Sequence, residues 1–229
     1  HGTAYTKMMA DYSDIHSEAL YYVPLNQTYE VWNLKVTNKS EVKRELTITG
    51  YAEFTNNNNY EQDQVNLQYS QFITRTEFEG DRIRHIIHGN LDWVTEGNEV
   101  DNKDVISRIF ALVGAQVDSY CGDKEAFLGR YREYRNPIGV EDGKLSGEMC
   151  YNENGCGALS TVMILQPGET KEIAFIVGMK DKKEADAMVF QTEKALGEVG
   201  DKLDAADKAA VEADCKALKE ILEKVNMED

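Results

Sequence analysis

The stretch with the clearest capacity for binding is polar and rich in amides: residues 56–68 read NNNNYEQDQVNLQ. Such a stretch can neither bury a continuous face nor pack as a strand, so it predicts a long loop. Compact domains seldom keep long loops without a use, and binding residues concentrate on them. A linker without function is the alternative. Trp93, in a second expected loop at residues 91–103, could stack on a ligand ring or close the end of the fold.

Catalytic and metal-binding chemistry find little support in the sequence. It holds no nucleophile motif, phosphate-binding loop or dinucleotide fingerprint, so we assign no catalytic residue and no cofactor. His85 and His88 are three residues apart, which on a strand places them on opposite faces and disfavours a shared metal. We expect ordinary surface or hydrogen-bonded histidines and no metal site. Glu53, Glu61 and Asp63 lie in or beside the polar loop and are expected to be solvated surface charges.

Residues 123–137 combine aromatic and basic side chains without a clean helical or strand period. The stretch holds Phe127, Tyr131, Tyr134 and Pro137 among Arg130, Arg132 and Arg135. A solvated loop rarely carries so many aromatic side chains, so this stretch should lie on a sheet face or in an interface. The three arginines could bind phosphate.

The elements that must position these residues are mostly strands. Alternating apolar and polar residues, with turn formers between the runs, predict an antiparallel meander. The expected strands span residues 5–9, 15–23, 29–37 and 43–51, and then residues 70–78, 82–88 and 109–114 after the polar loop. The short turn Glu79-Gly80-Asp81 joins two of them in a hairpin. Trp32, in the third strand, is expected in the core.

The last third of the chain reads as two more strands and then helices. Residues 157–165 and 172–177 are predicted to pair as a β-hairpin, because Pro167 and Gly168 between them favour a turn. Beyond Gly178, a composition rich in Ala, Lys, Glu and Leu predicts helices at residues 181–196 and 203–225, the second with an apolar stripe. We therefore expect a β-sandwich domain at residues 1–178 and a helical segment at residues 179–229.

Composition narrows the classes of function. The chain has 229 residues and a net charge of -16, from 25 basic and 41 acidic side chains, which argues against a nucleic acid or an anionic membrane as partner. No apolar run approaches the roughly 20 residues that span a bilayer. The four cysteines lack metal-like spacing and are expected to be reduced thiols in the cytoplasm. The chain begins with His1, which suggests a processed or truncated product and leaves a removed signal peptide possible.

Motifs that occur in one order along the chain carry a family resemblance. They are HGTAYT at 1–6, YVPL at 22–25, DKEAFLG at 123–129, NP at 136–137, GCGAL at 155–159 and PGETKE at 167–172. Up to about Gly178, the chain resembles the N-terminal β-sandwich of the cellobiose and cellodextrin phosphorylases, glycoside hydrolase family 94. The resemblance implies a mainly β fold, an antiparallel supersandwich similar to galactose mutarotase, followed by helices that link it to a catalytic barrel.

The same resemblance implies where the chemistry and the partners lie. In these enzymes an (α/α)6 barrel holds the general acid and the phosphate pocket, and such a barrel is expected beyond Asp229. Inorganic phosphate is then a co-substrate bound by the barrel, so the arginines at 130–135 are assigned to ion pairing at a domain or subunit contact. The implied partners are the catalytic barrel, a β-glucan oligosaccharide and a second copy of the chain in a homodimer.

One short run carries the implied binding site. Asn66-Leu67-Gln68-Tyr69 resembles an Asn-Phe-Gln-Arg run whose Gln and Arg reach across the homodimer into the neighbouring acceptor subsite. An amide both donates and accepts hydrogen bonds, which suits sugar hydroxyls. Here Tyr69 replaces the Arg, and an aromatic ring suits stacking on a further glucose unit. Asn66, Gln68, Tyr69 and Trp93 are the predicted substrate-binding residues, unless Gln68 and Tyr69 merely begin the next strand and pack.

Three hypotheses follow from the sequence. In the first, the chain is the dimerisation and acceptor-site-shaping domain of an inverting β-glucan phosphorylase that acts on cellodextrins. In the second, it is a stand-alone carbohydrate-binding module without catalysis. A mutarotase-like enzyme is a remote third hypothesis, since the histidine and carboxylate constellation that it needs is not discernible.

Overall fold

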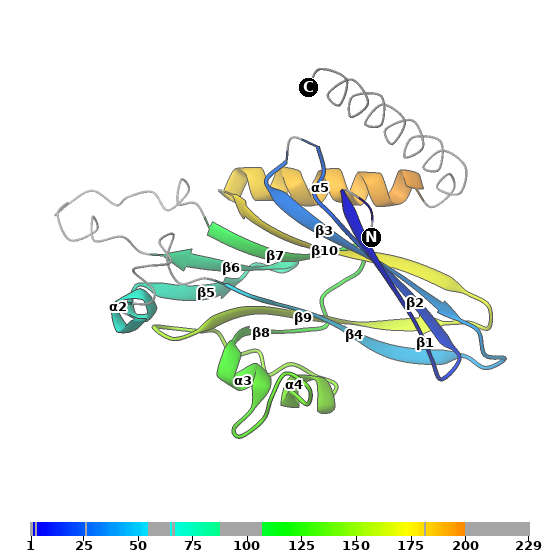
Figure 1. Cartoon of the computed structure of the whole chain (residues 1–229), viewed down its shortest axis with the longest axis horizontal. Helices are drawn as coiled ribbons and strands as arrows, with labels where there is room; N and C mark the ends of the chain where they lie inside the picture. The colour runs from blue at the N-terminus through cyan, green and yellow to red at the C-terminus, as the bar shows by residue number, and fades with distance from the viewer. Residues whose placement is uncertain are drawn as a thin grey trace, which may run out of the picture. The chain divides into compact units, whose positions relative to one another are not determined.

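The fold is known from a computed structural model (Figure 1), which describes residues 4–25, 27–54, 67–87, 107–180 and 182–199, together with Gly2 and Val65. The chain divides into two compact units, residues 1–190 and residues 191–229. Trp93, Asn66, His88 and the predicted helix at residues 203–225 lie outside the described residues. The domain boundary predicted at residue 178 therefore stays a prediction, although the last strand ends close by, at Lys180.

Two antiparallel sheets form the first unit, as the family resemblance implies. The larger sheet has seven strands in the order β1-β2-β3-β10-β7-β6-β5, and the smaller has three in the order β4-β9-β8. The strand bounds are β1 Tyr5–Tyr12, β2 Ile15–Tyr22, β3 Tyr29–Asn38, β4 Arg44–Glu53, β5 Thr74–Phe78, β6 Arg82–Ile87, β7 Ser107–Val113, β8 Ser119–Asp123, β9 Gly155–Leu165 and β10 Thr170–Lys180. The meander is confirmed for β1 to β3, but β4 leaves it and joins the smaller sheet.

The predicted hairpin between residues 157–165 and 172–177 is wrong. The turn itself forms, with Gly168 at φ 74° and the Glu169 N–H donating to the Gln166 carbonyl over 3.0 Å. However, β9 pairs with β4 and β8, whereas β10 pairs with β3 and β7, so the turn crosses from one sheet to the other. Buried Asn38 fixes the crossing, because its side-chain amide donates to the carbonyls of Leu165 and Gln166.

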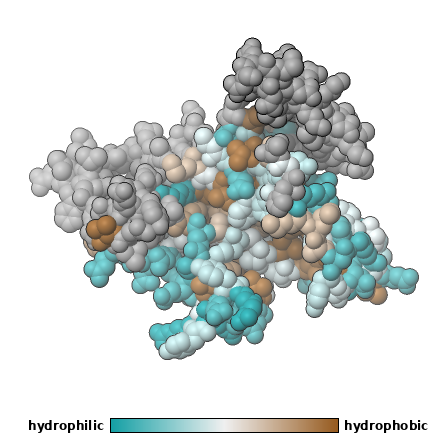
Figure 2. All heavy atoms as spheres, viewed as in Figure 1, coloured by the Kyte–Doolittle hydropathy of each residue, from teal (hydrophilic) through white to brown (hydrophobic). Residues whose placement is uncertain are grey.

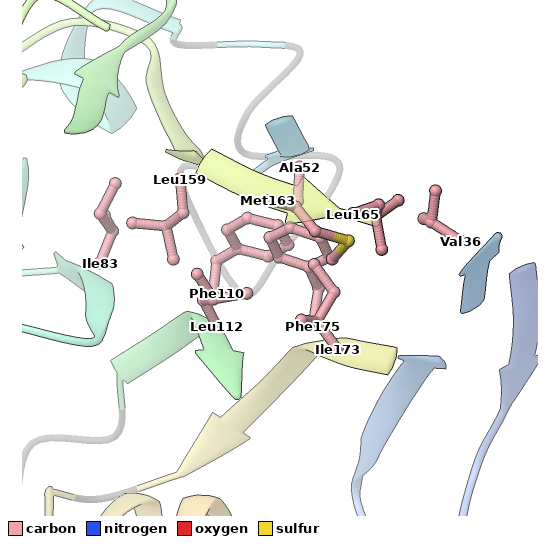
Figure 3. Close-up of a cluster of buried hydrophobic side chains, with 10 residues drawn as sticks. All are labelled: Val36, Ala52, Ile83, Phe110, Leu112, Leu159, Met163, Leu165, Ile173 and Phe175. Atoms are coloured by element: carbon pink, nitrogen blue, oxygen red, sulfur yellow. The ribbon is translucent and has the colours of Figure 1, made fainter. Parts of the chain in front are cut away.

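The core lies between the two sheets, as Figure 3 shows. Phe110 and Phe175 stack at 5.4 Å between ring centroids, and Trp32 meets Phe110 edge-on at 5.7 Å, which confirms the core position expected for Trp32. Glycine lets the sheets approach here: a Cβ on Gly50 would lie 2.4 Å from Phe175 Cε1, and one on Gly157 would lie 2.5 Å from Phe110 Cβ. The packing of aromatic rings against bare backbone therefore sets the sheet spacing.

Helices cover the outer faces of both sheets. The predicted helix at residues 181–196 is confirmed as α5, Lys182–Val199, whose first half runs along β3 and β10 (Figure 1) and buries Met188 and Val189. Asp186 of α5 pairs with Arg82 of β6 at 2.9 Å. The short helix α3, Lys124–Leu128, packs on β8 and β9, and the helix α4, Ile138–Glu141, packs on α3.

Two further predictions concern the cysteines and the membrane. Cys121, Cys150 and Cys156 are buried free thiols, as expected, and Cys215 lies outside the described residues. Within the described part of the chain, no helix is long and apolar enough to cross a bilayer.

Candidate functional site

The polar run that ends at Gln68 leads into a helix, not into a strand. Residues 67–72 form α2, Leu67–Phe72, and β5 starts only at Thr74, so the strand predicted from residue 70 is wrong over its first four positions. The alternative in which Gln68 and Tyr69 begin that strand is wrong for the same reason. Gln68 is exposed on this helix. The binding role of the predicted site residues stays a prediction.

Side-chain hydrogen bonds tie α2 to the segment that precedes β9. The Gln71 amide donates to Asn154 Oδ1 over 3.2 Å, and the Thr74 hydroxyl donates to the Gln71 carbonyl over 2.9 Å. The backbone N–H of Asn152 also donates to the Thr74 carbonyl over 3.0 Å. These contacts give α2 a defined position at the edge of the larger sheet, which a one-and-a-half-turn helix could not keep on its own propensity.

Two exposed aromatic side chains lie on the same elements, and the sequence alone did not single them out. Phe72 ends α2 and is 62% exposed, while Tyr151 lies opposite Arg75 of β5 in an isolated bridge and is 65% exposed. Large exposed aromatic side chains suit stacking on sugar or peptide. The local sequence pattern does not distinguish these two residues from aromatic residues of the core. Their exposure follows only from the way the strands pair.

His85 lies beneath this region and corrects the prediction of a surface or hydrogen-bonded histidine. It is fully buried, neither ring nitrogen has a hydrogen-bond partner, and the ring stacks on Phe54 at 5.1 Å. Burial, reinforced by the charge of Arg108, lowers the pKa of His85 to about 3. The imidazole is therefore neutral at physiological pH. Among the described residues, no group of three His, Cys, Asp or Glu side chains could hold a metal ion.

Glu53 also differs from the solvated charge that the sequence predicts. Its carboxylate accepts hydrogen bonds from Tyr51, Tyr134 and Lys124, the last over 3.0 Å. Partial burial alone would raise the pKa of Glu53, but these hydrogen bonds outweigh it and lower the pKa. A general acid in glycoside cleavage needs the opposite shift. Glu53 instead joins the aromatic and basic stretch to the smaller sheet.

That stretch lies partly on the outer face of the smaller sheet, as predicted, and partly in solvent. Phe127 stacks on Tyr51 at 4.3 Å between centroids, whereas Tyr131 is fully exposed at φ 59°. Arg135 pairs with Glu133 within the stretch, and Arg132 pairs with Glu141 of α4, which follows the stretch directly. The loop borders a shallow hollow of about 630 Å³, lined by Arg130, Tyr131, Arg132, Arg135, Asn136, Pro137, Val140 and Glu141. The two ion pairs are local, so a contact with another domain or subunit stays a prediction.

Comparison with known proteins agrees with the fold and with the resemblance found in the sequence. The supersandwich domain of glycosyl hydrolase 94 matches residues 1–195. The chain is 32% identical over 181 residues to an N,N'-diacetylchitobiose phosphorylase from Vibrio furnissii, covering 78% of this chain and 21% of that enzyme. It is 26% identical over 201 residues to a solabiose phosphorylase from Paenibacillus borealis, covering 88% of this chain and 24% of that enzyme. The chain thus spans about a quarter or less of these relatives.

A second kind of relative matches a much smaller part of the chain. A stretch of 43 residues, 19% of this chain, is 56% identical to the chaperone protein DnaK from Prochlorococcus marinus, of which it covers 7%.

Proposed function

Because the chain belongs to the glycosyl hydrolase 94 supersandwich family, we propose that it is the dimerisation and acceptor-site-shaping domain of an inverting glycoside phosphorylase. The observation that carries this proposal is the match over residues 1–195, together with relatives that are phosphorylases. In the proposed reaction, a phosphate oxygen attacks the anomeric carbon from the face opposite the leaving sugar. The leaving glycosidic oxygen takes a proton from a general acid. The products are α-glucose 1-phosphate and a shortened sugar.

The chain itself would bind the sugar and shape the acceptor site, and the catalytic barrel would cleave the glycosidic bond. Glu53 at the sandwich surface has a lowered pKa and accepts three hydrogen bonds, so it suits a structural role and not proton donation. Exposed Gln68 can donate to one sugar hydroxyl and accept from another. We place this reaction in the cytoplasm, where the buried thiols would stay reduced.

A cellodextrin is the proposed acceptor, and the relatives supply the competing sugars for its test. By the family resemblance, Tyr69 takes the place of an arginine of the cellobiose phosphorylases, and an aromatic ring would favour a longer chain through stacking on a further glucose. The two relatives are named for N,N'-diacetylchitobiose and for solabiose. All three sugars therefore belong in one comparison.

A domain exchange tests this function. Residues 1–195 would replace the matching domain of the Vibrio furnissii phosphorylase, and release of sugar 1-phosphate would be measured with cellobiose, cellotetraose and N,N'-diacetylchitobiose. We expect an active chimera whose preference shifts toward cellotetraose. Gln68→Ala should raise the KM for the sugar by about tenfold, the loss of one good hydrogen bond. Gln71→Ala, in the same helix, is the control for altered helix packing. A folded chimera without phosphorolysis of any sugar would contradict the proposal.

A stand-alone carbohydrate-binding module is the second candidate function, favoured by the exposed rings of Phe72 and Tyr151 beside α2. Isothermal titration of the whole chain with cellotetraose separates the two candidates. Binding that is lost in Phe72→Ala and Tyr151→Ala would favour the module. An absence of binding, with an active chimera, would favour a site that only the barrel completes.

The chaperone likeness favours a separate role for part of the helical segment. The phosphorylase family model ends at residue 195, so we infer that the chaperone-like stretch of 43 residues lies at the C-terminal end of the chain and overlaps the last residues of that match. It would then be a chaperone-type segment and not a linker to a barrel. Binding of an unfolded, fluorescently labelled peptide to the whole chain would be compared with binding to a chain that ends at Val199. Equal binding by the two would contradict this role.

A further inference from the structure

The hollow beside residues 130–141 differs in charge from the rest of the chain. Its lining includes Arg130, Arg132 and Arg135 against one glutamate, Glu141. Three positive charges and one negative charge leave +2 around the hollow, whereas the whole chain carries -16. Figure 2 shows that the projection that carries α3 and α4, below the smaller sheet in Figure 1, is mainly hydrophilic. A positive hollow in an acidic protein favours an anionic ligand.

Arg132 offers one side of its guanidinium group to such a ligand. Its hydrogen bonds to Glu141 and to the Asn136 carbonyl both leave from Nη1. Within the described part of the chain, Nε and Nη2 of Arg132 donate to no other group. These two atoms carry parallel N–H bonds, which match two oxygens of a phosphate or a carboxylate. The ion pair with Glu141 thus positions the guanidinium group without using its bidentate side.

Arg130 and Arg135 add charge to the same hollow. Arg130 has no ion pair or hydrogen bond with the residues that the structure describes. Arg135 pairs with Glu133 at 3.5 Å, but the two side chains are 86% and 75% exposed, and so exposed a pair contributes little to stability. Arg135 can therefore exchange Glu133 for a ligand. A phosphate monoester, with a charge of about -1.5 to -2 at neutral pH, matches the hollow better than a singly charged carboxylate.

Tyr131 supplies an apolar surface beside the arginines. Its side chain is fully exposed, and its backbone lies at φ 59°, a left-handed conformation that bulky residues rarely adopt. The Arg132 N–H donates to the Gly129 carbonyl over 3.2 Å, just after this residue. The Asn136 N–H donates to the Glu133 carbonyl over 3.0 Å. Residues held in such strained conformations cluster at ligand sites, and an exposed aromatic ring suits stacking on a sugar.

The base of the loop is fixed on the smaller sheet. Tyr134 donates a hydrogen bond to Glu53, and Lys124 Nζ lies 5.3 Å from the centroid of the Tyr134 ring. Pro137, at the end of the loop, is buried. The hollow is thus formed without a ligand, which lowers the entropy cost of binding. Its volume of about 630 Å³ lies in the range of sites for small molecules.

We propose that this hollow binds the phosphate monoester of a sugar, with the phosphate on Arg130, Arg132 and Arg135 and the sugar ring on Tyr131. Inorganic phosphate offers similar charge but nothing for the aromatic ring, so the ligand class is a sugar phosphate. This use of the arginines is an alternative to a contact with another domain or subunit. The choice of α-glucose 1-phosphate as the probe rests on the function proposed above, because it is the product of that reaction.

Isothermal titration of the whole chain tests the class of ligand. The probes are α-glucose 1-phosphate, inorganic phosphate and glucose, in about 0.05 M salt so that charges are weakly screened. We expect α-glucose 1-phosphate to bind at least about fivefold more tightly than inorganic phosphate, because stacking on Tyr131 adds to the affinity. Glucose, which lacks the charge, should not bind measurably. Equal affinity for the two phosphates, or no binding of either, would overturn the proposal.

Substitutions in the hollow test the residues. Arg132→Lys keeps the charge beside Glu141 but loses the bidentate side, and should weaken binding of α-glucose 1-phosphate by about tenfold. Arg130→Gln removes a charge without breaking an internal contact and should weaken it by about fivefold. Lys171→Gln removes an equal charge from β10, outside the hollow, and is the control. Equal weakening by Arg130→Gln and Lys171→Gln would show attraction by overall charge only and would overturn the site.

A glycine at position 131 gives an independent readout. Tyr131→Gly keeps the positive φ without steric cost, so the loop should keep its shape. The affinity for α-glucose 1-phosphate should fall to that for inorganic phosphate, whose own affinity should not change. An equal loss for both ligands would contradict stacking on Tyr131. Binding by the wild-type chain alongside an inactive domain-exchange chimera would defeat the proposed function but not this site. An active chimera alongside a chain that binds no sugar phosphate would defeat this inference alone.

Discussion

The two edges of the seven-stranded sheet differ in how much of each is covered by other parts of the chain. At β5, Cys150 and Asn152 form backbone hydrogen bonds along the strand, and Thr74, Thr76 and His85 are buried there. At β1, the other edge, almost every residue is exposed. The covered edge carries α2 and the candidate binding residues. Its hydrogen bonds therefore hold in place the surface that would bind a sugar. The exposed strand β1 contributes little to the core.

The largest effect on stability is expected when a side chain is added inside the closely packed region beside β5. A Cβ on Gly155 would lie 2.7 Å from His85 Cδ2 and 2.9 Å from Thr76 Cγ2, both of them buried. Gly155→Ala should lower the free energy of unfolding by about 3 kcal/mol, measured by urea denaturation. His85→Ala in the same chain should recover part of this loss by making room. If the two effects simply add, the clash with His85 is not the cause.

A smaller loss of unfolding free energy is expected when a hydroxyl that forms two hydrogen bonds at the covered edge is removed. The Thr76 hydroxyl accepts from the Cys150 N–H over 2.8 Å and donates to the Gly122 carbonyl over 3.3 Å. Thr76→Val keeps the shape but leaves a buried N–H unpaired, at a cost of about 2 kcal/mol. Thr76→Ser keeps the hydroxyl and serves as the matched control. Equal stability of the valine and serine variants would show that the hydroxyl is not needed.

The covered side should also respond to acid. The pKa of His85 falls from 6.5 to about 3 on folding, so between these values the unfolded chain binds a proton that the folded chain does not. Stability from this group is complete above pH 6.5 and is lost as the pH falls, by about 1.4 kcal/mol per pH unit. His85→Leu should remove this part of the pH dependence, as measured by urea denaturation between pH 4.5 and 8. Parallel profiles for the two proteins would contradict the assignment.

The exposed strand β1 should show the smallest effect on folding. Met9→Lys replaces an exposed side chain with a charged one and should change the free energy of unfolding of the monomer by less than about 0.5 kcal/mol. A large loss of stability in dilute, monomeric protein would mean that β1 is packed more tightly than its exposure indicates.

The strands and the turn between β9 and β10 show which features of the fold can be predicted from neighbouring residues in the sequence. The alternation around Trp32 and the turn at Pro167 and Gly168 depend on nearby residues, so the strands and the turn were predictable. Which strands pair was not, because a turn that suits a hairpin also suits a crossing between two sheets. The choice depends on Asn38, which is distant in sequence and holds the crossing through two carbonyls.

For the candidate site, too, some features could be predicted from the sequence and others could not. The sequence by itself determined the family and the supersandwich, because motif order and composition can be read along the chain. Only the tertiary structure decided that Gln68 lies on a helix, that His85 is buried without a partner, and that Glu53 is a hydrogen-bonded anchor. Burial and hydrogen bonding are set by residues brought together from distant strands. No window along the chain contains that information.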